Sequence, residues 1–319
     1  MIVVYLFFSL DIFHYLCLCK IYANTQMKKI LISVIVIVSA IMSLKAQEAD
    51  TMFPYPNIPD NLTTLEDRSN YLISHFWDRC NMKSAFSAKD KLRQAFIDYI
   101  NVAPYAHLDT VNASVDDLIE KVKKADQKNL LPLAQMAQDA LFGDSAQFWS
   151  DDLYLPFAKA VVDSKKIHKS HKARFQYHVQ ILTYSKQGAI AFPLEFTDIN
   201  GQEQSLKDIS APCIVLFFNE VDCDDCMIAR ARLSVDMNAK QAIQNGKLKI
   251  VSINPCEADD EWKENASSYS NQWIKGATPE VDNYFDMRKT PCIYILDKDH
   301  TILAKNIDID TLLNIISRL

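Results

Sequence analysis

The feature that most constrains the fold is a short apolar run that leads directly into a pair of closely spaced cysteines. Six apolar residues occupy 213–218, and Cys223 and Cys226 follow after a four-residue link. A continuous apolar run of this length is typical of a strand buried on both faces of a sheet. A helical pattern from Met227 to Met237 comes next. The sequence therefore predicts a Cys-x-x-Cys pair at the junction between a buried strand and a helix.

Strand patterns and helical patterns alternate through the whole C-terminal half. In order, they are a β-hairpin turning at 198–201, a buried strand at 248–253, a polar helix at 259–269, a hairpin at 292–304 and a final amphipathic helix capped by Asp308. This order predicts an α/β fold, with an extra β-hairpin at its N-terminal end, over residues 187–319.

The preceding part of the chain has a helical pattern. After a Pro-rich extended segment, apolar residues recur at helical spacing over 65–186 and indicate five or six helices. Two of these helices are expected to begin at capping boxes, Ser87 with Asp90 and Ser114 with Asp117.

Length and composition fit this division. A chain of 319 residues suits two domains, and we expect an α+β arrangement with an all-helical domain over 47–186 and the α/β domain over 187–319. A net charge of −6 argues against nucleic-acid binding, and eight cysteines are too few for a disulfide-stapled scaffold. Five glycines give no phosphate-binding loop, and the sequence shows neither a Ser-His-Asp arrangement nor His pairs at metal spacing.

Residues 27–46 have the layout of an export signal. Two lysines follow Met27, an uncharged apolar run covers 30–44, and Ala46 gives a cleavage point. A membrane anchor is the competing interpretation, but the run is shorter than the roughly 20 residues of a spanning helix. Residues 1–26 are also apolar and precede this signal. We interpret them as the result of a start codon assigned too early, at Met1 instead of Met27, and a second membrane anchor is the alternative. We expect export to the periplasm or cell envelope of a Gram-negative bacterium, with no stable membrane span after cleavage.

The spacing of the cysteine pair suits a disulfide closed within the first turn of a helix. The first sulfur then lies among backbone N–H groups that the helix leaves unpaired, and these stabilise a thiolate. A thiolate at Cys223 can attack the disulfide of another molecule, and Cys226 can resolve the mixed disulfide that forms. The strand–helix context makes the pair a candidate redox site.

From about residue 189 onward the chain resembles the thioredoxin superfamily, in particular the bacterial envelope thiol-disulfide oxidoreductases that begin with an extra β-hairpin. The resemblance rests on CIVLFFNEVDCDDC, from Cys213, and on YFDMRKTPCIYILDKDHTIL, from Tyr284. It implies a cis-proline at Pro291 that faces the cysteine pair, with Thr290 and Pro291 as the dock for an extended substrate backbone. The helical part resembles an uncharacterised domain that precedes such domains in envelope proteins.

The redox motif departs from the family pattern in its charge. Asp222 replaces the usual Trp, Asp224 and Asp225 replace Gly-Pro, and Phe217 replaces the buried acid of thioredoxin. Because like charge opposes a thiolate, we expect these three aspartates to raise the pKa of Cys223 above that of strongly oxidising relatives. For Asp224 and Asp225 a second interpretation stays open, since acids in a first turn also stabilise a helix.

The other cysteines of the predicted mature chain leave several alternatives open. Cys256 and Cys292 are expected at the same edge of the sheet as the Cys223–Cys226 pair. They are members of a zinc site, partners in an accessory disulfide, or plain buried thiols. Cys213, which opens a buried strand, and Cys80, which we place in a helix, are expected to be inert core thiols.

One basic cluster, residues 165–174, has two interpretations. It is either a solvated helix face or a docking surface for the acidic C-terminal half or for an acidic partner. Residues 186–319 hold 14 basic and 21 acidic side chains, so the acidity concentrates around the redox motif.

These features predict an exported thiol-disulfide oxidoreductase of the reductase or isomerase type, with Cys223 as nucleophile and Cys226 as resolving thiol. The expected partners are a protein or small-molecule thiol or disulfide, and an envelope thiol reductant as electron donor. No cofactor and no metal are expected. The alternative is a non-catalytic thioredoxin-like binding module in which the Cys223–Cys226 disulfide is structural.

Overall fold

The structure is a computed structural model that describes residues 51–143, 146 and 148–319. The predicted leader, residues 1–46, lies outside the described residues. Within the described ranges, no helix combines the length and apolar character needed to cross a membrane. The chain divides into two compact units between Val111 and Asn112. The predicted domain boundary at 186/187 separates two types of secondary structure and stays a prediction.

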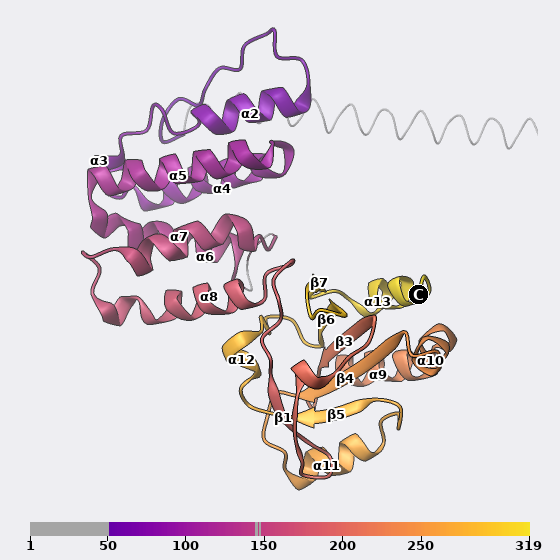
Figure 1. The fold of residues 1–319 in the computed structure, drawn as a ribbon. Helices are drawn as coiled ribbons and strands as arrows, with labels where there is room; N and C mark the ends of the chain where they lie inside the picture. The colour runs from indigo at the N-terminus through magenta and orange to yellow at the C-terminus, as the bar shows by residue number, and fades with distance from the viewer. Residues whose placement is uncertain (1–50, 144–145, 147) are drawn as a thin grey trace, which may run out of the picture. The chain divides into compact units, whose positions relative to one another are not determined.

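The first compact unit is helical and has an aromatic core. It contains α2 (Leu65–His75), α3 (Met82–Ala85), α4 (Lys89–Val102) and the start of α5 (Leu108–Ala125) (Figure 1). The ring of Phe76 packs against Phe53 at 5.9 Å and against Tyr99 at 5.4 Å between centroids. Contacts of this kind bury large apolar areas in a small unit.

Neither predicted capping box starts a helix. Helix α4 begins at Lys89 after Ala88, which makes no side-chain capping hydrogen bond. Ser114 is buried inside α5, because the apolar pattern of this helix extends further toward its N-terminus, to Val111. A capping-box spacing therefore misplaced both helix starts.

The second unit begins with more helices and continues into the sheet. After α5 come α6 (Leu130–Leu141), α7 (Asp151–Asp163) and α8 (Ala173–Tyr184). Between residues 65 and 184 the described chain thus holds seven α-helices, more than the five or six predicted, because the four-residue α3 has no periodic signal. The helical character of this part is confirmed.

The C-terminal part forms a mixed, seven-stranded sheet, as expected for the α/β fold. Its strands are β1 (Glu195–Asp198), β2 (Glu203–Ser205), β3 (Cys213–Phe218), β4 (Leu248–Asn254), β5 (Ile274–Ala277), β6 (Cys292–Asp297) and β7 (Ile302–Lys305). Their order across the sheet is β2-β1-β5-β4-β3-β6-β7, with β3, β4 and β5 parallel and the others antiparallel to their neighbours.

Alternate residues of the central strands point into two separate apolar layers. On one face, Val215 and Phe217 of β3 pack with the helices α9 (Asp224–Val235), α10 (Met237–Gln244), α11 (Asp260–Ser267) and α13 (Ile309–Ile316). On the other face, Leu216 and Phe218 pack with α12 (Val281–Tyr284) and the segment before β1. Strand β3 is buried on both faces, as its continuous apolar run predicts.

The topology gathers three loops at one edge of the sheet. Because β3 and β4 are parallel, the loops that follow them leave from the same edge. Strand β6 runs antiparallel to β3, and its first residue, Cys292, pairs with Phe218 at the end of β3. The loop carrying Pro291 therefore reaches the edge from which the Cys223 loop departs.

Three elements of the C-terminal part were not predicted from the sequence: helix α10, strand β5 and the short helix α12. Strand β5 includes Lys275 and Gly276, which give no alternation and favour a loop. Gly276 is required because a Cβ at this position would overlap the ring of Phe196. The close approach of the neighbouring strand β1 explains the glycine.

Candidate functional site

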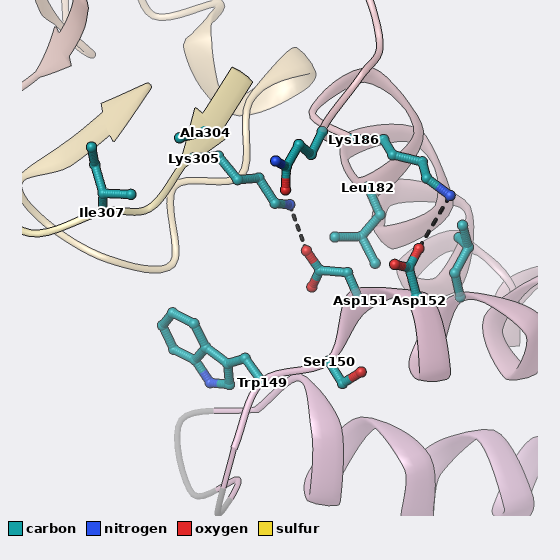
Figure 2. A pocket seen from close by; sticks show the side chains of 11 residues that line it. Trp149, Ser150, Asp151, Asp152, Leu182, Lys186, Ala304, Lys305 and Ile307 are labelled. Carbon is teal, nitrogen blue, oxygen red and sulfur yellow. Dashed lines mark ion pairs between the residues drawn. The ribbon is translucent and has the colours of Figure 1, made fainter. Parts of the chain in front are cut away.

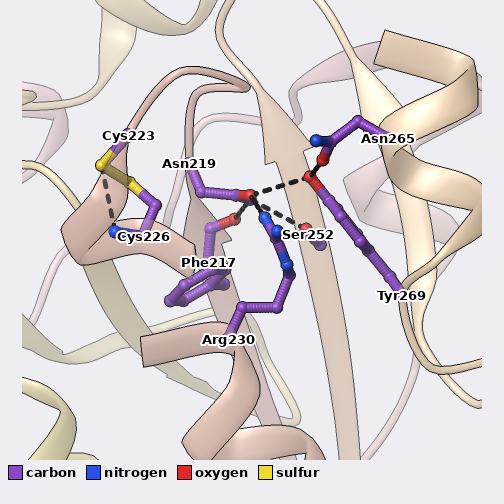
Figure 3. Close-up of a disulfide and its surroundings, with 8 residues drawn as sticks. All are labelled: Phe217, Asn219, Cys223, Cys226, Arg230, Ser252, Asn265 and Tyr269. Carbon is purple, nitrogen blue, oxygen red and sulfur yellow. Dashed lines mark hydrogen bonds between the residues drawn. A yellow bond between two sulfur atoms is a disulfide. The ribbon is translucent and has the colours of Figure 1, made fainter. Parts of the chain in front are cut away.

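The cysteine pair forms a disulfide at the start of α9, as the spacing predicts. Cys223 is the N-cap residue of the helix, with extended backbone, and the Cα atoms of Cys223 and Cys226 lie 5.1 Å apart. The Sγ of Cys223 accepts a hydrogen bond from the N–H of Cys226 at 3.0 Å (Figure 3). The first sulfur thus lies at the helix N-terminus, where unpaired N–H groups stabilise negative charge.

The two sulfurs differ in accessibility. Cys226 lies in the first turn of α9 and is completely buried, whereas Cys223 is partly exposed. An attacking group from outside can therefore reach Cys223 and not Cys226. The roles of Cys223 as nucleophile and Cys226 as resolving thiol stay predictions.

Four carboxylates surround the pair along the chain. Glu220, Asp222, Asp224 and Asp225 are all exposed, and the last two lie in the first turn of α9. In the part of the chain that the structure describes, none of the four forms an ion pair or a side-chain hydrogen bond. Their negative charge is therefore directed to solvent around the disulfide. The modulating role of Asp222, Asp224 and Asp225 stays a prediction.

A buried polar network fixes the start of the loop that leads to Cys223. Asn219, the residue after β3, is 2% exposed. Its amide nitrogen donates to Phe217 O at 3.1 Å and to Ser252 Oγ at 2.9 Å, and Ser252 belongs to β4. Asn219 thereby ties the loop to two neighbouring strands, as Figure 3 shows.

The oxygen of the same amide meets a cation from α9. Arg230 donates to Asn219 Oδ1 at 3.3 Å, and its guanidinium carbon lies 4.0 Å from the ring centroid of Tyr269. The hydroxyl of Tyr269 lies 3.3 Å from Asn219 Oδ1 and 2.5 Å from Asn265 Oδ1. The network was not predicted, although a polar residue between a buried strand and a cysteine pair is a usable signal.

The bond between Thr290 and Pro291 is cis, as the resemblance implies. Thr290 is exposed and Pro291 is partly buried. Cys292, which follows, is fully buried and opens β6. The dock for a substrate backbone at Thr290 and Pro291 stays a prediction.

Cys256 and Cys292 do not form the accessory disulfide, and their environments differ. Cys256 is exposed, so its interpretation as a buried thiol is wrong. It lies in the loop after β4, at the edge of the sheet from which the Cys223 loop also departs. Cys292 is a buried thiol within hydrogen-bond distance of Asp286 O (3.3 Å) and Asn306 Oδ1 (3.1 Å). Within the described ranges, no group of three or more His, Cys, Asp or Glu side chains is placed to hold a metal ion.

The two remaining cysteines also differ. Cys213 is buried in β3, as expected, and burial raises its pKa to about 11. Cys80 is partly buried and lies after α2, outside any helix, with its Sγ 3.9 Å from Met82 Sδ. Its placement in a helix was wrong because the helical pattern breaks at His75.

The basic cluster 165–174 is not a helix face. Most of it forms the connection between α7 and α8, with a 3-10 turn at Lys169–His171. Lys172 folds back and donates to the carbonyl oxygens of Val162 (2.7 Å) and Ser164 (2.5 Å). These contacts cap the end of α7 with a positive charge.

The comparisons with known proteins concern both parts of the chain. Residues 26–185, half of the sequence, match the model of a family described as a domain of unknown function (DUF5106). The chain belongs to the DUF5106 family. A search of the curated proteins found no match.

Among solved structures, the chain is similar to a thioredoxin-like protein from Bacteroides caccae, at 23% sequence identity and a TM-score of 0.70. The alignment covers 83% of this chain and 98% of that protein. It is also similar to the thioredoxin domain of a thiol-disulfide oxidoreductase from Bacteroides vulgatus, at 19% identity and a TM-score of 0.36, over 41% and 96% of the two chains. The first similarity confirms the thioredoxin-like fold.

Proposed function

We propose that this DUF5106 protein is a thiol-disulfide oxidoreductase that exchanges electrons at Cys223 and Cys226. The observation that carries the proposal is the asymmetric disulfide at the start of α9, with Cys223 partly exposed and Cys226 buried. Such an arrangement combines an accessible sulfur, a helix N-terminus that stabilises a thiolate and an internal thiol within reach.

The exchange proceeds in two balanced steps from the reduced form. The thiolate of Cys223 attacks one sulfur of a substrate disulfide, and the substrate S–S bond breaks as a mixed disulfide forms. The released substrate thiolate takes up a proton. Cys226 then loses its proton and attacks the Cys223 sulfur, which releases the second substrate thiol and closes the Cys223–Cys226 disulfide. The protein loses two electrons, and the substrate gains them.

Continued turnover requires a partner that reduces the disulfide again. We propose an envelope thiol reductant in this role, and a protein or small-molecule disulfide as substrate. The export signal predicted at 27–46 supports a location in the periplasm or cell envelope of a Gram-negative bacterium, where disulfides form. The polypeptide substrate would lie along Thr290 and Pro291.

The acidic surroundings support the reductase or isomerase direction. Carboxylates at Asp222, Asp224 and Asp225 oppose a thiolate at Cys223, which makes the reduced pair less favourable and its electrons easier to donate. Their exposure and lack of ion-pair partners in the described chain keep this charge unneutralised.

A trapping experiment tests the proposal. The mature chain carrying Cys226→Ser, reduced beforehand, should form a stable mixed disulfide through Cys223 with a disulfide-cyclised peptide, visible as a mass increase. The matched variant Cys223→Ser should form no adduct at Cys226, because Cys226 is buried, and peptide mapping distinguishes this outcome from an adduct at the exposed Cys256. If neither variant forms an adduct, the pair is a structural disulfide and the protein is a binding module.

The stability of the oxidised and reduced forms gives a second criterion. A redox disulfide should be reduced by dithiothreitol while the circular dichroism of the protein stays unchanged. Loss of structure on reduction would instead indicate that the disulfide holds the fold together.

A further inference from the structure

The loop that ends at the cis-proline is held by helices of the DUF5106 region. We define the docking loop as residues 285–291. Its Asp286 N–H donates to Ser185 Oγ at 3.1 Å, just after α8. Earlier in both segments, Gln180 of α8 donates to Asn283 O at 2.8 Å. The rings of Tyr184 and Tyr284 pack with their centroids 5.6 Å apart. Helix α8 thus contacts both α12 and the beginning of the docking loop.

Arg288, three residues before Pro291, makes the second connection. Its guanidinium donates to Asp151 Oδ1 at 2.6 Å, at the first residue of α7, and to Phe142 O at 3.1 Å, at the end of α6. The guanidinium carbon lies 3.9 Å from the ring centroid of Phe142 and 4.6 Å from that of Trp149. Two charge-assisted contacts and two aromatic faces therefore hold one side chain of the docking loop.

The charges around Arg288 balance within a partly buried cluster. Asp286 is fully buried and accepts from Arg288 at 2.6 and 2.8 Å. Burial alone would raise the pKa of Asp286, but the hydrogen bonds and charge of Arg288, together with Lys305, lower it. Lys305 also pairs with Asp151 at 2.5 Å. We call Asp151, Asp286, Arg288 and Lys305 the Arg288 cluster.

Apolar packing does not fill the space beside this cluster. A cavity of about 560 Å³ opens there, lined by residues of α7, α8 and β7 and of the segments next to them, among them Trp149, Asp152 and Lys186 (Figure 2). Asp152 pairs with Lys186 at 3.1 Å, next to the Asp151–Lys305 pair. Beside this cavity, the ion pair of Asp151 and Lys305 connects α7 to strand β7.

We infer that α6 and α7 hold the docking loop in position through Arg288, which makes Arg288 and Asp151 positioning residues for the exchange of polypeptide disulfides. The inference rests on the proposed function, because it assigns the helical region to the substrate dock of that same site. Removing Asp151 leaves an uncompensated positive charge in the cluster and frees Arg288 from α7. The backbone at Thr290 and Pro291 then loses a fixed position, although the cysteine pair on α9 is unchanged.

The experiment compares two disulfides that differ in their need for the dock. The reduced, mature full chain carries Cys256→Ser in every variant, so that this exposed thiol does not contribute to the reaction. It is mixed with a small aromatic disulfide, 5,5′-dithiobis(2-nitrobenzoate), or with a disulfide-cyclised peptide whose extended backbone can pair with the docking loop. We expect Asp151→Asn and Arg288→Gln to raise the half-saturating peptide concentration about tenfold, while the rate with the small disulfide changes less than about twofold. Arg288→Lys keeps the charge but loses the two-pronged geometry of the guanidinium, so its half-saturating peptide concentration should lie between those of the wild type and Arg288→Gln.

Asp152→Asn is the matched control, because Asp152 is the next residue on α7 and its partner, Lys186, lies outside the docking loop. It should leave both reactions unchanged. The inference would be overturned if Asp151→Asn slowed the reactions with both disulfides equally, or slowed neither of them. A wild-type protein that reacts with neither disulfide would overturn the proposed function, and the inference with it.

Amide hydrogen exchange gives a readout that does not depend on activity. Asp151→Asn should speed exchange in residues 286–290 by at least tenfold and leave β3 and α9 unchanged, whereas Asp152→Asn should change neither. If exchange in the docking loop of Asp151→Asn equals that of the wild type, the cluster does not position the loop. Should Arg288→Gln fail to fold, Asp151→Asn and Arg288→Lys carry the same test.

Discussion

The hydroxyl of Tyr154 lies 2.6 Å from Nδ1 of His178 and joins α7 to α8 in the core of the second compact unit. His178 is 6% exposed, and its ring packs against Phe142 at 4.3 Å between centroids. Burial, reinforced by the positive charges of Arg174 and Arg288, lowers the pKa of His178 to about 4. The imidazole is therefore neutral in the folded protein near pH 7.

This pair predicts a loss of stability in mild acid. An unfolded histidine has a pKa of about 6.5, so between pH 6.5 and 4 the unfolded chain binds a proton that the folded chain does not. The free energy of unfolding should fall by about 2 kcal/mol between pH 7 and pH 5 from this residue alone. Urea unfolding of the wild type and of His178→Phe at both pH values checks the prediction. An equal pH dependence in the two proteins would contradict it.

Asn219 should contribute to stability out of proportion to its size. In Asn219→Ala, the hydroxyl of Ser252 and the guanidinium of Arg230 each lose a partner at the base of the redox loop, and a buried group left unpaired costs about 1–3 kcal/mol. Urea unfolding of the oxidised protein measures the change. Asn238→Ala, an exposed asparagine of α10, serves as the control and should stay within about 0.5 kcal/mol of the wild type.

The elements with strong periodic patterns could be predicted from sequence. Strand β3 occupies the predicted residues, and α9 starts where the cysteine pair places it, because a buried strand and a helix N-terminus leave local signals. Asp308 caps the final helix α13 as expected, accepting from the N–H of Thr311 at 2.7 Å. These assignments depend only on residues that are close together along the chain.

The remaining features depend on distant parts of the chain that meet only after folding. Asp151 and Arg288 are 137 residues apart, and neither has a pattern around it that indicates its partner. Strand β5 has no alternation of its own and exists because β1 and β4 pair with it on both sides. The Arg288 cluster, the Asn219 network and β5 therefore required the three-dimensional structure.

The cysteines outside the redox pair should differ in their reaction with iodoacetamide. Cys256 is exposed and should react first in the native, oxidised protein, but more slowly than a free cysteine at pH 8. The protein around this thiol removes part of its hydration, which raises its pKa. The negative charges of four nearby carboxylates raise the pKa further, those of Glu220, Asp259, Asp282 and Glu257. Less thiolate is therefore present. Buried Cys213 and Cys292 should react only after denaturation. Peptide mass spectrometry checks the order, and equal rates for Cys256 and Cys292 in the native protein would contradict it.

The acids in the first turn of α9 should control the redox pair by charge. In Asp224→Asn/Asp225→Asn, two carboxylates that oppose a thiolate are lost, so we expect the pKa of reduced Cys223 to fall by about 0.5 or more and the pair to become more oxidising. Titration of the thiolate absorbance at 240 nm measures this pKa, and a wild-type value near or below about 5 would contradict the reductase or isomerase assignment.

A second effect of the same acids can be separated from the first. Asp224 and Asp225 also interact favourably with the N-terminus of α9, so their loss should cost about 0.3–1 kcal/mol of stability each whether or not they affect Cys223. Glu195→Gln/Glu264→Gln removes the same net charge from exposed positions outside the redox loop. If this control lowers the pKa of Cys223 as much as the α9 variant does, net charge rather than the local carboxylates sets it. If the α9 variant loses stability with no change in pKa, the acids act only on the helix.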